Sequence, residues 1–103
     1  MTENEKKILN LLGLARRAGK LYAGQDKVID GCRKGKLLVI MTNDCSANVL
    51  RALNGAKCVC LDCNRTELGQ SVGLKTAQVA ALDVNNGFVE KILSLANRSD
   101  VNE

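Results

Sequence analysis

The sequence predicts a single-domain α/β protein, a three-layer α/β/α sandwich around a mixed central sheet of about four strands. Helix-like and strand-like segments alternate along the chain with short connections, which is typical of this architecture. A continuous apolar run at residues 37–41 is too short for a helix and predicts a strand covered by helices on both faces. We expect one domain over residues 1–97 and a polar tail over 98–103.

Helix caps and glycines divide the chain into elements. Thr2 with Glu5, and Asn64 with Glu67, match the capping-box pattern, and Ser46 is a third expected N-cap. Glycines follow most predicted helices, where they supply the left-handed backbone that ends a helix. The predicted order is helix 3–18, extended segment 20–23, helix 24–35, strand 37–41, helix 47–54, strand 57–61, helix 65–72, strand 77–82 and a last helix capped by Asn85 or Asn86.

Positive charge is concentrated in residues 13–36. Seven basic side chains there oppose only Asp26 and Asp30, and seven minus two gives +5, whereas the whole chain carries +4. Five glycines in the same window place bare backbone amides beside that charge, and the combination indicates a phosphate-rich partner. The alternative is a solvated face with glycine helix ends.

The five cysteines do not predict a metal site. A structural zinc site usually takes two Cys-x-x-Cys pairs, and here the ligands beside the 58–63 cluster would have to be Cys45 or Cys32, which belong to unrelated elements. The odd number of cysteines argues against a disulfide framework. We expect Cys58 and Cys60 to pack as small hydrophobic side chains on one face of a strand.

Enzyme constellations are missing from the sequence, so we expect no enzymatic activity and no cofactor. The chain has no histidine for acid-base chemistry, and residues 13–21 differ from a phosphate-binding P-loop in spacing and in lacking its Ser or Thr. Cys45, beside a helix N-cap that could lower its pKa, has no partner base. No apolar run approaches the length of a membrane span and no signal peptide is evident, so we expect a cytosolic protein without membrane contact. We also expect a monomer.

The aromatic content argues against binding of single strands by base stacking. The only aromatic side chains are Tyr22 and Phe88, and Phe88 falls on a core-facing helical stripe, so no stacking platform is expected. Recognition of a folded RNA by basic residues, helix N-termini and polar edges remains. The segment around Gly24 fits this mode because it would present helix amides together with Lys27.

Three segments carry a family resemblance: LLGLARRAGKLYAGQ, RKGKLLVIMTND and RTELGQSVG. Together they resemble the small bacterial YlxQ-type proteins. These belong to a superfamily whose ribosomal members, L-seven-Ae and L-thirty-e, bind kinked RNA. The resemblance spans nearly the whole chain and implies the same α/β/α fold and an RNA-binding role associated with the ribosome or another translational RNA.

The resemblance also places an RNA-binding site. In the kink-turn binders of the superfamily a Gly begins the second helix and corresponds to Gly24, but the Asn, Glu and Lys that read the RNA correspond to Asp26, Lys27 and Asp30. The turn that receives an extruded nucleotide corresponds to Asn43 and Asp44, and a further RNA-contacting loop to residues 74–77, which should lie beside the start of the second helix.

These observations predict a protein that binds a bent or bulged, kink-turn-like RNA, with ribosomal RNA or ribonucleoprotein components as partners. The alternative is a protein-interaction module that kept this fold after losing kink-turn recognition. Phosphates are assigned to Lys20, Lys36 and Lys75, and base contacts to Gln25 and Lys27. The complete expected set is Lys20, Gly24, Gln25, Asp26, Lys27, Asp30, Lys36, Asn43, Asp44, Lys75, Thr76 and Ala77.

Overall fold

The computed structural model describes the backbone of residues 1–101 and the side chains of residues 1–97. Its elements are α1 (Glu3–Arg17), β1 (Tyr22–Ala23), α2 (Gln25–Lys34), β2 (Leu37–Met41), α3 (Ala47–Ala52), β3 (Lys57–Cys60), α4 (Arg65–Ser71), β4 (Val79–Asp83) and α5 (Gly87–Val101). The four strands form one sheet in the order β1-β4-β2-β3. β4 is antiparallel to β1 and β2, whereas β2 and β3 are parallel, so the sheet is mixed.

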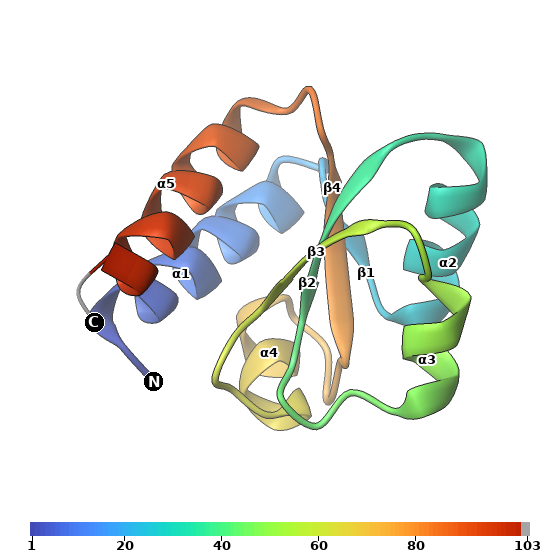
Figure 1. The fold of residues 1–103 in the computed structure, drawn as a ribbon, viewed down its shortest axis with the longest axis horizontal. Coiled ribbons are helices and arrows are strands. Elements are labelled where there is room, and N and C mark those ends of the chain that lie inside the picture. The colour runs from blue at the N-terminus through green and yellow to red at the C-terminus, as the bar shows by residue number, and fades with distance from the viewer. Residues whose placement is uncertain (102–103) are drawn as a thin grey trace.

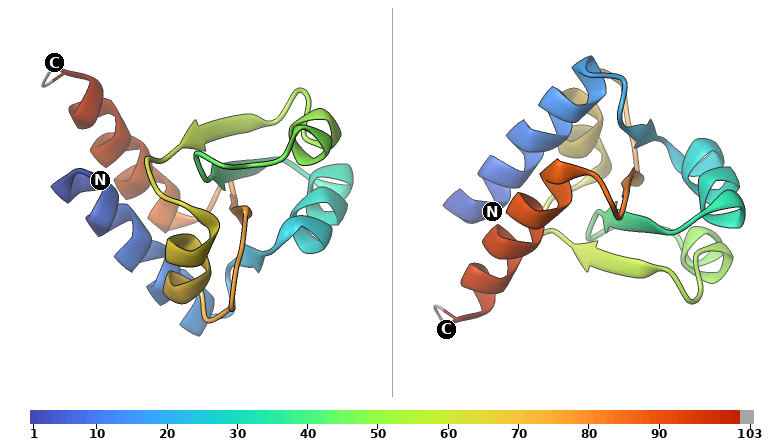
Figure 2. Two further views of the ribbon diagram at one scale, coloured as in Figure 1. Left: turned by 90° about the horizontal axis from the view of Figure 1, so that it is seen from below. Right: turned by 90° about the horizontal axis from the view of Figure 1, so that it is seen from above.

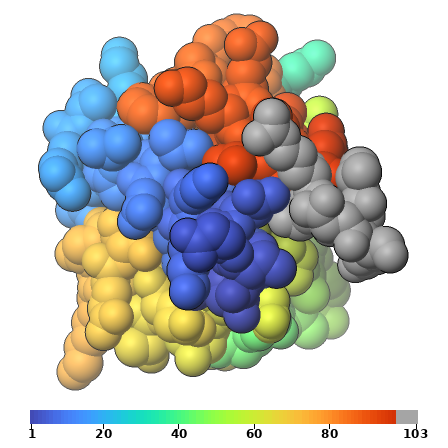
Figure 3. Space-filling model, turned by 90° about the vertical axis from the view of Figure 1, so that its left-hand side faces the viewer, coloured from blue at the N-terminus to red at the C-terminus, as the bar shows by residue number. Residues whose placement is uncertain are grey.

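Helices cover both faces of the sheet (Figure 1): α1, α4 and α5 lie on one side and α2 and α3 on the other. Each face of the sheet has its own hydrophobic core, and β2 contributes to both. Leu38 and Ile40 pack toward α1, α4 and α5, whereas Leu37 and Val39 pack toward α2 and α3. The end-on views show the three layers directly (Figure 2). Figure 3 shows α1 and α5 side by side with the α4 region below them. The predicted sandwich and the two-sided burial of residues 37–41 are confirmed.

The predicted caps are present. Thr2 and Asn64 each accept a hydrogen bond from the amide three residues on, and Glu5 and Glu67 complete the capping boxes. Asn86 caps α5 through a 2.9 Å hydrogen bond from the amide of Phe88 to its Oδ1. These local bonds explain why the helix starts could be predicted from sequence alone.

The last strand and the last helix differ from the prediction in their ends. β4 begins at Val79 rather than residue 77, because the Ala77 amide donates to the carbonyl of Arg65 and holds this segment against α4. α5 continues to Val101, beyond the predicted boundary at residue 97. The last two residues of the expected tail, 102–103, lie outside the described residues. Within residues 1–101, no helix is both long enough and apolar enough to span a membrane.

The expectation that Cys58 and Cys60 are packed is wrong. Both residues are exposed. β3 is an edge strand, and no helix packs extensively on it in the described part of the chain, so the face carrying these thiols stays open to solvent.

Candidate RNA-binding surface

Three segments meet at one end of the sheet: the start of α2, the loop between β2 and α3, and the loop between α4 and β4. β1 and β2 both run toward this end and β4 starts from it. The Gly24 amide donates to the carbonyl of Val79 at 3.1 Å, and the Thr42 amide donates to that of Gln78 at 3.0 Å. Figure 1 shows the three chain segments toward the lower end of the sheet. We call this surface, residues 24–27, 43–46, 65 and 74–78, the α2-start surface.

The first turn of α2 is open to a ligand. Gly24 takes the N-cap position with a φ of +92°, a conformation that favours glycine, and no described side chain caps the helix. Gln25, Asp26 and Lys27 follow, and all three are exposed. The free amides of this turn and the helix dipole together favour an anionic group such as a phosphate.

Gln78 joins the three segments, and sequence reasoning did not identify it. Its Oε1 accepts a 2.7 Å hydrogen bond from the amide of Ser46, and its Nε2 donates to Oε1 of Gln25 at 3.4 Å. No local sequence signal distinguishes this glutamine, because its two partners lie 32 and 53 residues away in the chain.

An ion pair orders the β2–α3 loop. Nε of Arg65 lies 3.4 Å from Oδ2 of Asp44, and Nη2 of Arg65 donates to the carbonyl of Asp44 at 3.0 Å. The buried hydroxyl of Thr42 faces the same carboxylate. This hydroxyl, the amide of Arg65 and its guanidinium together lower the pKa of Asp44. Asp44 therefore stays ionised and neutralises Arg65, which leaves Lys27 and Lys75 as the unpaired cations among the described residues of this surface.

The α4–β4 loop is pressed against α4. A Cβ atom at Gly69 would lie 2.6 Å from Cα of Thr76 and 2.9 Å from the carbonyl oxygen of Lys75, so only glycine permits this approach. The Leu74 amide donates to the carbonyl of Gly69 at 2.8 Å, and the Leu74 side chain lies beside Gly24. The predicted proximity of residues 74–77 to the start of the second helix is confirmed.

Nine of the twelve predicted site residues lie on the α2-start surface, although Ala77 is only 5% exposed and can offer a ligand little beyond its main chain. Asp30 lies a turn further along α2, where its carboxylate pairs with Nζ of Lys34 at 3.0 Å.

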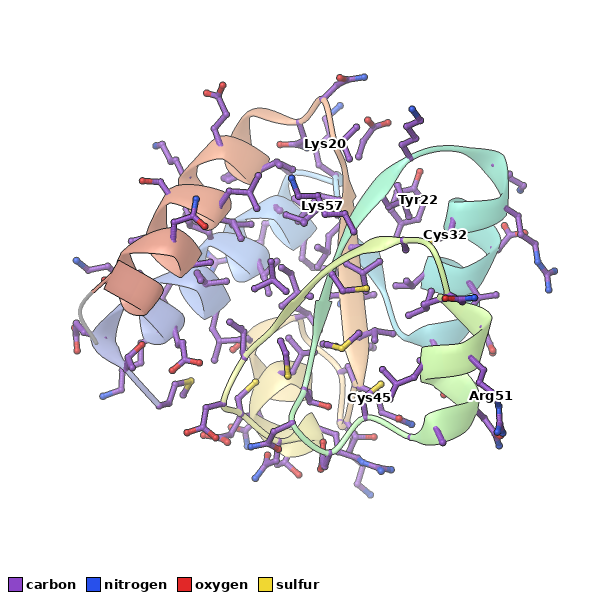
Figure 4. All side chains as sticks on the ribbon, in the orientation of Figure 1. Lys20, Tyr22, Cys32, Cys45, Arg51 and Lys57 are labelled. Atoms are coloured by element: carbon purple, nitrogen blue, oxygen red, sulfur yellow. The ribbon has the colours of Figure 1, made fainter. Side chains whose placement is uncertain are left out.

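Lys20 and Lys36 lie at the opposite end of the sheet, because they precede β1 and β2 whereas Gly24 and Asn43 follow these strands. Figure 4 shows Lys20 at the upper end and Cys45, next to Asp44, at the lower end. The structure therefore does not bring these two predicted phosphate ligands together with the other predicted site residues. The order of residues before and after each predicted strand was the signal that could have separated them.

Thiol chemistry is not favoured at Cys45. Burial and the nearby Cys60 raise the pKa of Cys45, so the lowering that a helix start could cause is not found there. Burial, with the charges of Glu67 and Glu5, raises the pKa of Cys63 to about 11. Among the described residues, no group of three Cys, Asp or Glu side chains is arranged to hold a metal ion.

Two curated relatives cover most of the chain. The RNA-binding protein YlxQ of Bacillus subtilis is 38% identical, covering 82% of this chain and 90% of the relative. The RNA-binding protein YlxQ of Enterococcus faecium is 34% identical, covering 89% of this chain and 93% of the relative. The chain belongs to the YlxQ family of RNA-binding proteins. These relatives are named for RNA binding and not for catalysis, in agreement with the expectation that the protein is not an enzyme.

Solved structures support the fold of this YlxQ-family protein. A Bacillus halodurans C protein of unknown function superimposes with a TM-score of 0.74 at 28% identity, covering 88% of this chain and 97% of that chain. A Giardia lamblia 15.5kD RNA binding protein superimposes with a TM-score of 0.72 at 16% identity, covering 98% and 91%. At that identity the second likeness shows the fold alone. No protein-family model matches the chain.

Proposed function

We propose that the protein binds a bent or bulged, structured RNA through the α2-start surface, as a cytosolic monomer in a translational context. The observation that carries the proposal is the uncapped first turn of α2 next to Lys27, with the α4–β4 loop packed beside it. A helix start with free amides suits a phosphate, and a sharp bend in RNA brings phosphates and unpaired bases to one compact surface.

Side chains at the edge of this surface suit base recognition. The Gln25 amide can pair with an adenine, the Lys27 ammonium can donate to guanine O6 and N7, and the Asp26 carboxylate can accept from a cytosine amino group. The bond between Gln25 and Gln78 is long at 3.4 Å, so Gln25 can exchange it for a base. Because Asp26 and Lys27 replace the Asn and Glu of kink-turn binders, we propose that the preferred RNA is bent but differs from a kink-turn at the bases it presents.

A gel-shift titration tests the proposal. The probes are a hairpin with an asymmetric bulge from ribosomal RNA and a fully paired hairpin of the same composition, each at two salt concentrations. We expect tighter binding of the bulged hairpin and a clear fall in affinity with salt, because even three or four neutralised phosphates give a steep dependence. Equal affinity for the two hairpins would contradict recognition of a bend, and absence of binding would contradict the proposal as a whole.

A protein-interaction role is the second candidate, and it is favoured by Asp26 and by the pairing of Arg65 with Asp44, which reduce the positive charge of the α2-start surface. This reading predicts that neither hairpin binds. It also predicts that Lys27→Glu combined with Lys75→Glu leaves the amount of RNA copurified from cell lysate unchanged.

A further inference from the structure

The end of the sheet opposite the α2-start surface holds an open cleft of about 1000 Å³ between the end of α1 and the start of α5. Both aromatic residues of the chain, Tyr22 and Phe88, line this cleft, together with Lys20, Lys91, Asn85 and Asp83. We call it the Tyr22 cleft. We did not expect this aromatic pair to bind a ligand, because the sequence could not show that β1 and α5 bring the two residues to one cavity.

Tyr22 is held so that part of its ring faces solvent. It is 38% exposed, and the Cδ1–Cε1 edge of the ring lies against α2, where a Cβ atom at Gly31 would come within 3.2 Å of it. Packing of one edge limits the motion of the ring, which lowers the entropic cost of stacking a base on it. Phe88 is half-buried against the α1–α5 core and contributes apolar surface to the lining of the cleft.

The charge around the Tyr22 cleft is mainly positive. Lys20 and Lys91 line it and are exposed, and Asp83 is the carboxylate among its lining residues. Val84, the residue after Asp83, lines a neighbouring cleft of about 510 Å³, where Arg33, Lys36 and Lys57 meet no carboxylate among the lining residues. Figure 4 shows Lys20, Tyr22 and Lys57 at the same end of the molecule. The two predicted phosphate ligands that the α2-start surface lacks therefore line these two clefts, Lys20 the Tyr22 cleft and Lys36 its neighbour.

We infer that the Tyr22 cleft binds a single-stranded segment that flanks the structured element of the same RNA. An unstacked base lies on Tyr22, phosphates lie near Lys20 and Lys91, and Asn85 and Asp83 offer polar groups to the base or to a ribose hydroxyl. Aromatic stacking combined with lysines is the chemistry that single-stranded RNA requires, whereas a rigid duplex keeps its bases stacked within the helix. The inference rests on the RNA binding proposed above and adds a second contact to it.

A pair of RNAs tests this. The first is the bulged hairpin, and the second is the same hairpin with an unstructured oligouridylate extension long enough to cross the 33 Å length of the molecule. We expect the extension to tighten binding to the wild-type protein by at least about fivefold, since stacking of one base contributes on that scale. Tyr22→Leu should abolish this gain and leave binding of the bare hairpin unchanged, whereas Tyr22→Phe, which keeps the ring, should retain the gain.

Lys20→Glu with Lys91→Glu serves as a second variant that leaves the packed ring untouched. Lys6→Glu with Arg51→Glu is the matched charge control, because both residues are exposed and neither lines this cleft or the neighbouring one. The first pair should remove the gain and the control should keep it. Equal affinity for the two RNAs, or a gain that survives in Tyr22→Leu, would overturn the inference while leaving the proposed function intact. If neither RNA binds, the proposed function fails and this inference fails with it.

As an independent readout, NMR spectra of the protein with free oligouridylate should show saturable shifts of amide signals at residues 19–22 and 83–88. Shifts confined to residues 24–27 and 74–78 would contradict a separate single-strand cleft.

Discussion

Replacing Gly69 by alanine should destabilise the protein and displace the α4–β4 loop. The new Cβ atom would lie 2.6 Å from Cα of Thr76 and 2.9 Å from the carbonyl oxygen of Lys75, and both neighbours are main-chain atoms. Carbon atoms in contact normally lie about 3.5 to 4.0 Å apart, so the loop would have to move outward by about 1 Å. A side-chain rotation cannot relieve this contact.

The net effect follows from three contributions. Overpacking of a tight site costs about 1 to 3 kcal/mol. Movement of the loop also strains the hydrogen bond from the Leu74 amide to the carbonyl of Gly69, 2.8 Å long, and weakening such a bond costs about 1 kcal/mol. Alanine in place of glycine within a helix recovers about 1 kcal/mol. We therefore expect the free energy of unfolding to fall by about 2 kcal/mol, and the melting temperature by about 10 °C for a domain of this size.

Urea unfolding followed by circular dichroism measures this loss, and the bulged-hairpin titration measures the effect of the displaced loop on RNA affinity. Gly87→Ala is the matched control, because Gly87 also lies in a helix and its new Cβ atom would meet nothing within 4 Å. It should leave stability unchanged or raise it by up to about 1 kcal/mol, the gain that alanine makes over glycine within a helix. If Gly69→Ala were as stable as Gly87→Ala, the reasoning that the loop packs rigidly on α4 would be wrong.

Three further predictions concern other parts of the molecule. Gln78→Ala should weaken binding of the bulged hairpin about fivefold, because it removes the hydrogen bonds that join Gln78 to Ser46 and Gln25. The control Gln70→Ala, on the exposed side of α4, should leave the affinity unchanged. Equal affinities of the two variants would contradict the bridging role of Gln78. Burial alone would raise the pKa of the Glu5 carboxyl, but hydrogen bonds from the amides of Asp62 and Thr2 outweigh this effect and lower the pKa below 4.5. The stability that Glu5 contributes is therefore present above pH 4.5, and it is lost as the pH falls through the folded-state pKa. As the pH is lowered across this acid range, the urea midpoint of Glu5→Gln should fall less steeply than that of the wild type. Equal slopes of midpoint against pH for the two proteins would refute this. Iodoacetamide should modify exposed Cys58 and Cys60 in the native protein but Cys63, 1% exposed, only after unfolding, as peptide mass spectrometry would show; early labelling of Cys63 would contradict its burial.

Much of the fold could be predicted because its signals are local. Thr2 and Asn64 cap helices through residues three positions away, and the unbroken apolar run of β2 requires cover on both faces. Neither inference depends on knowing how distant segments are arranged.

The errors concern the order and direction of strands, which no local pattern determines. Cys58 and Cys60 alternate as strand residues should, but their exposure follows from the position of β3 at the sheet edge. Lys20 and Lys36 are close in sequence to Gly24, yet one strand length separates each of them from the α2-start surface. The concentrated charge of residues 13–36 is therefore divided between the two ends of the sheet.

The central claim is that the α2-start surface holds RNA phosphates, and the salt dependence of binding tests it most directly. The measurement compares the affinity for the bulged hairpin over a range of salt concentrations for the wild type, for Lys27→Glu with Lys75→Glu, and for the control Lys6→Glu with Lys7→Glu. We predict that the first double variant binds more weakly and that its slope of log affinity against log salt is shallower by about two, one for each lost phosphate contact, while the control keeps the wild-type slope. Equal slopes for the two double variants would contradict the claim.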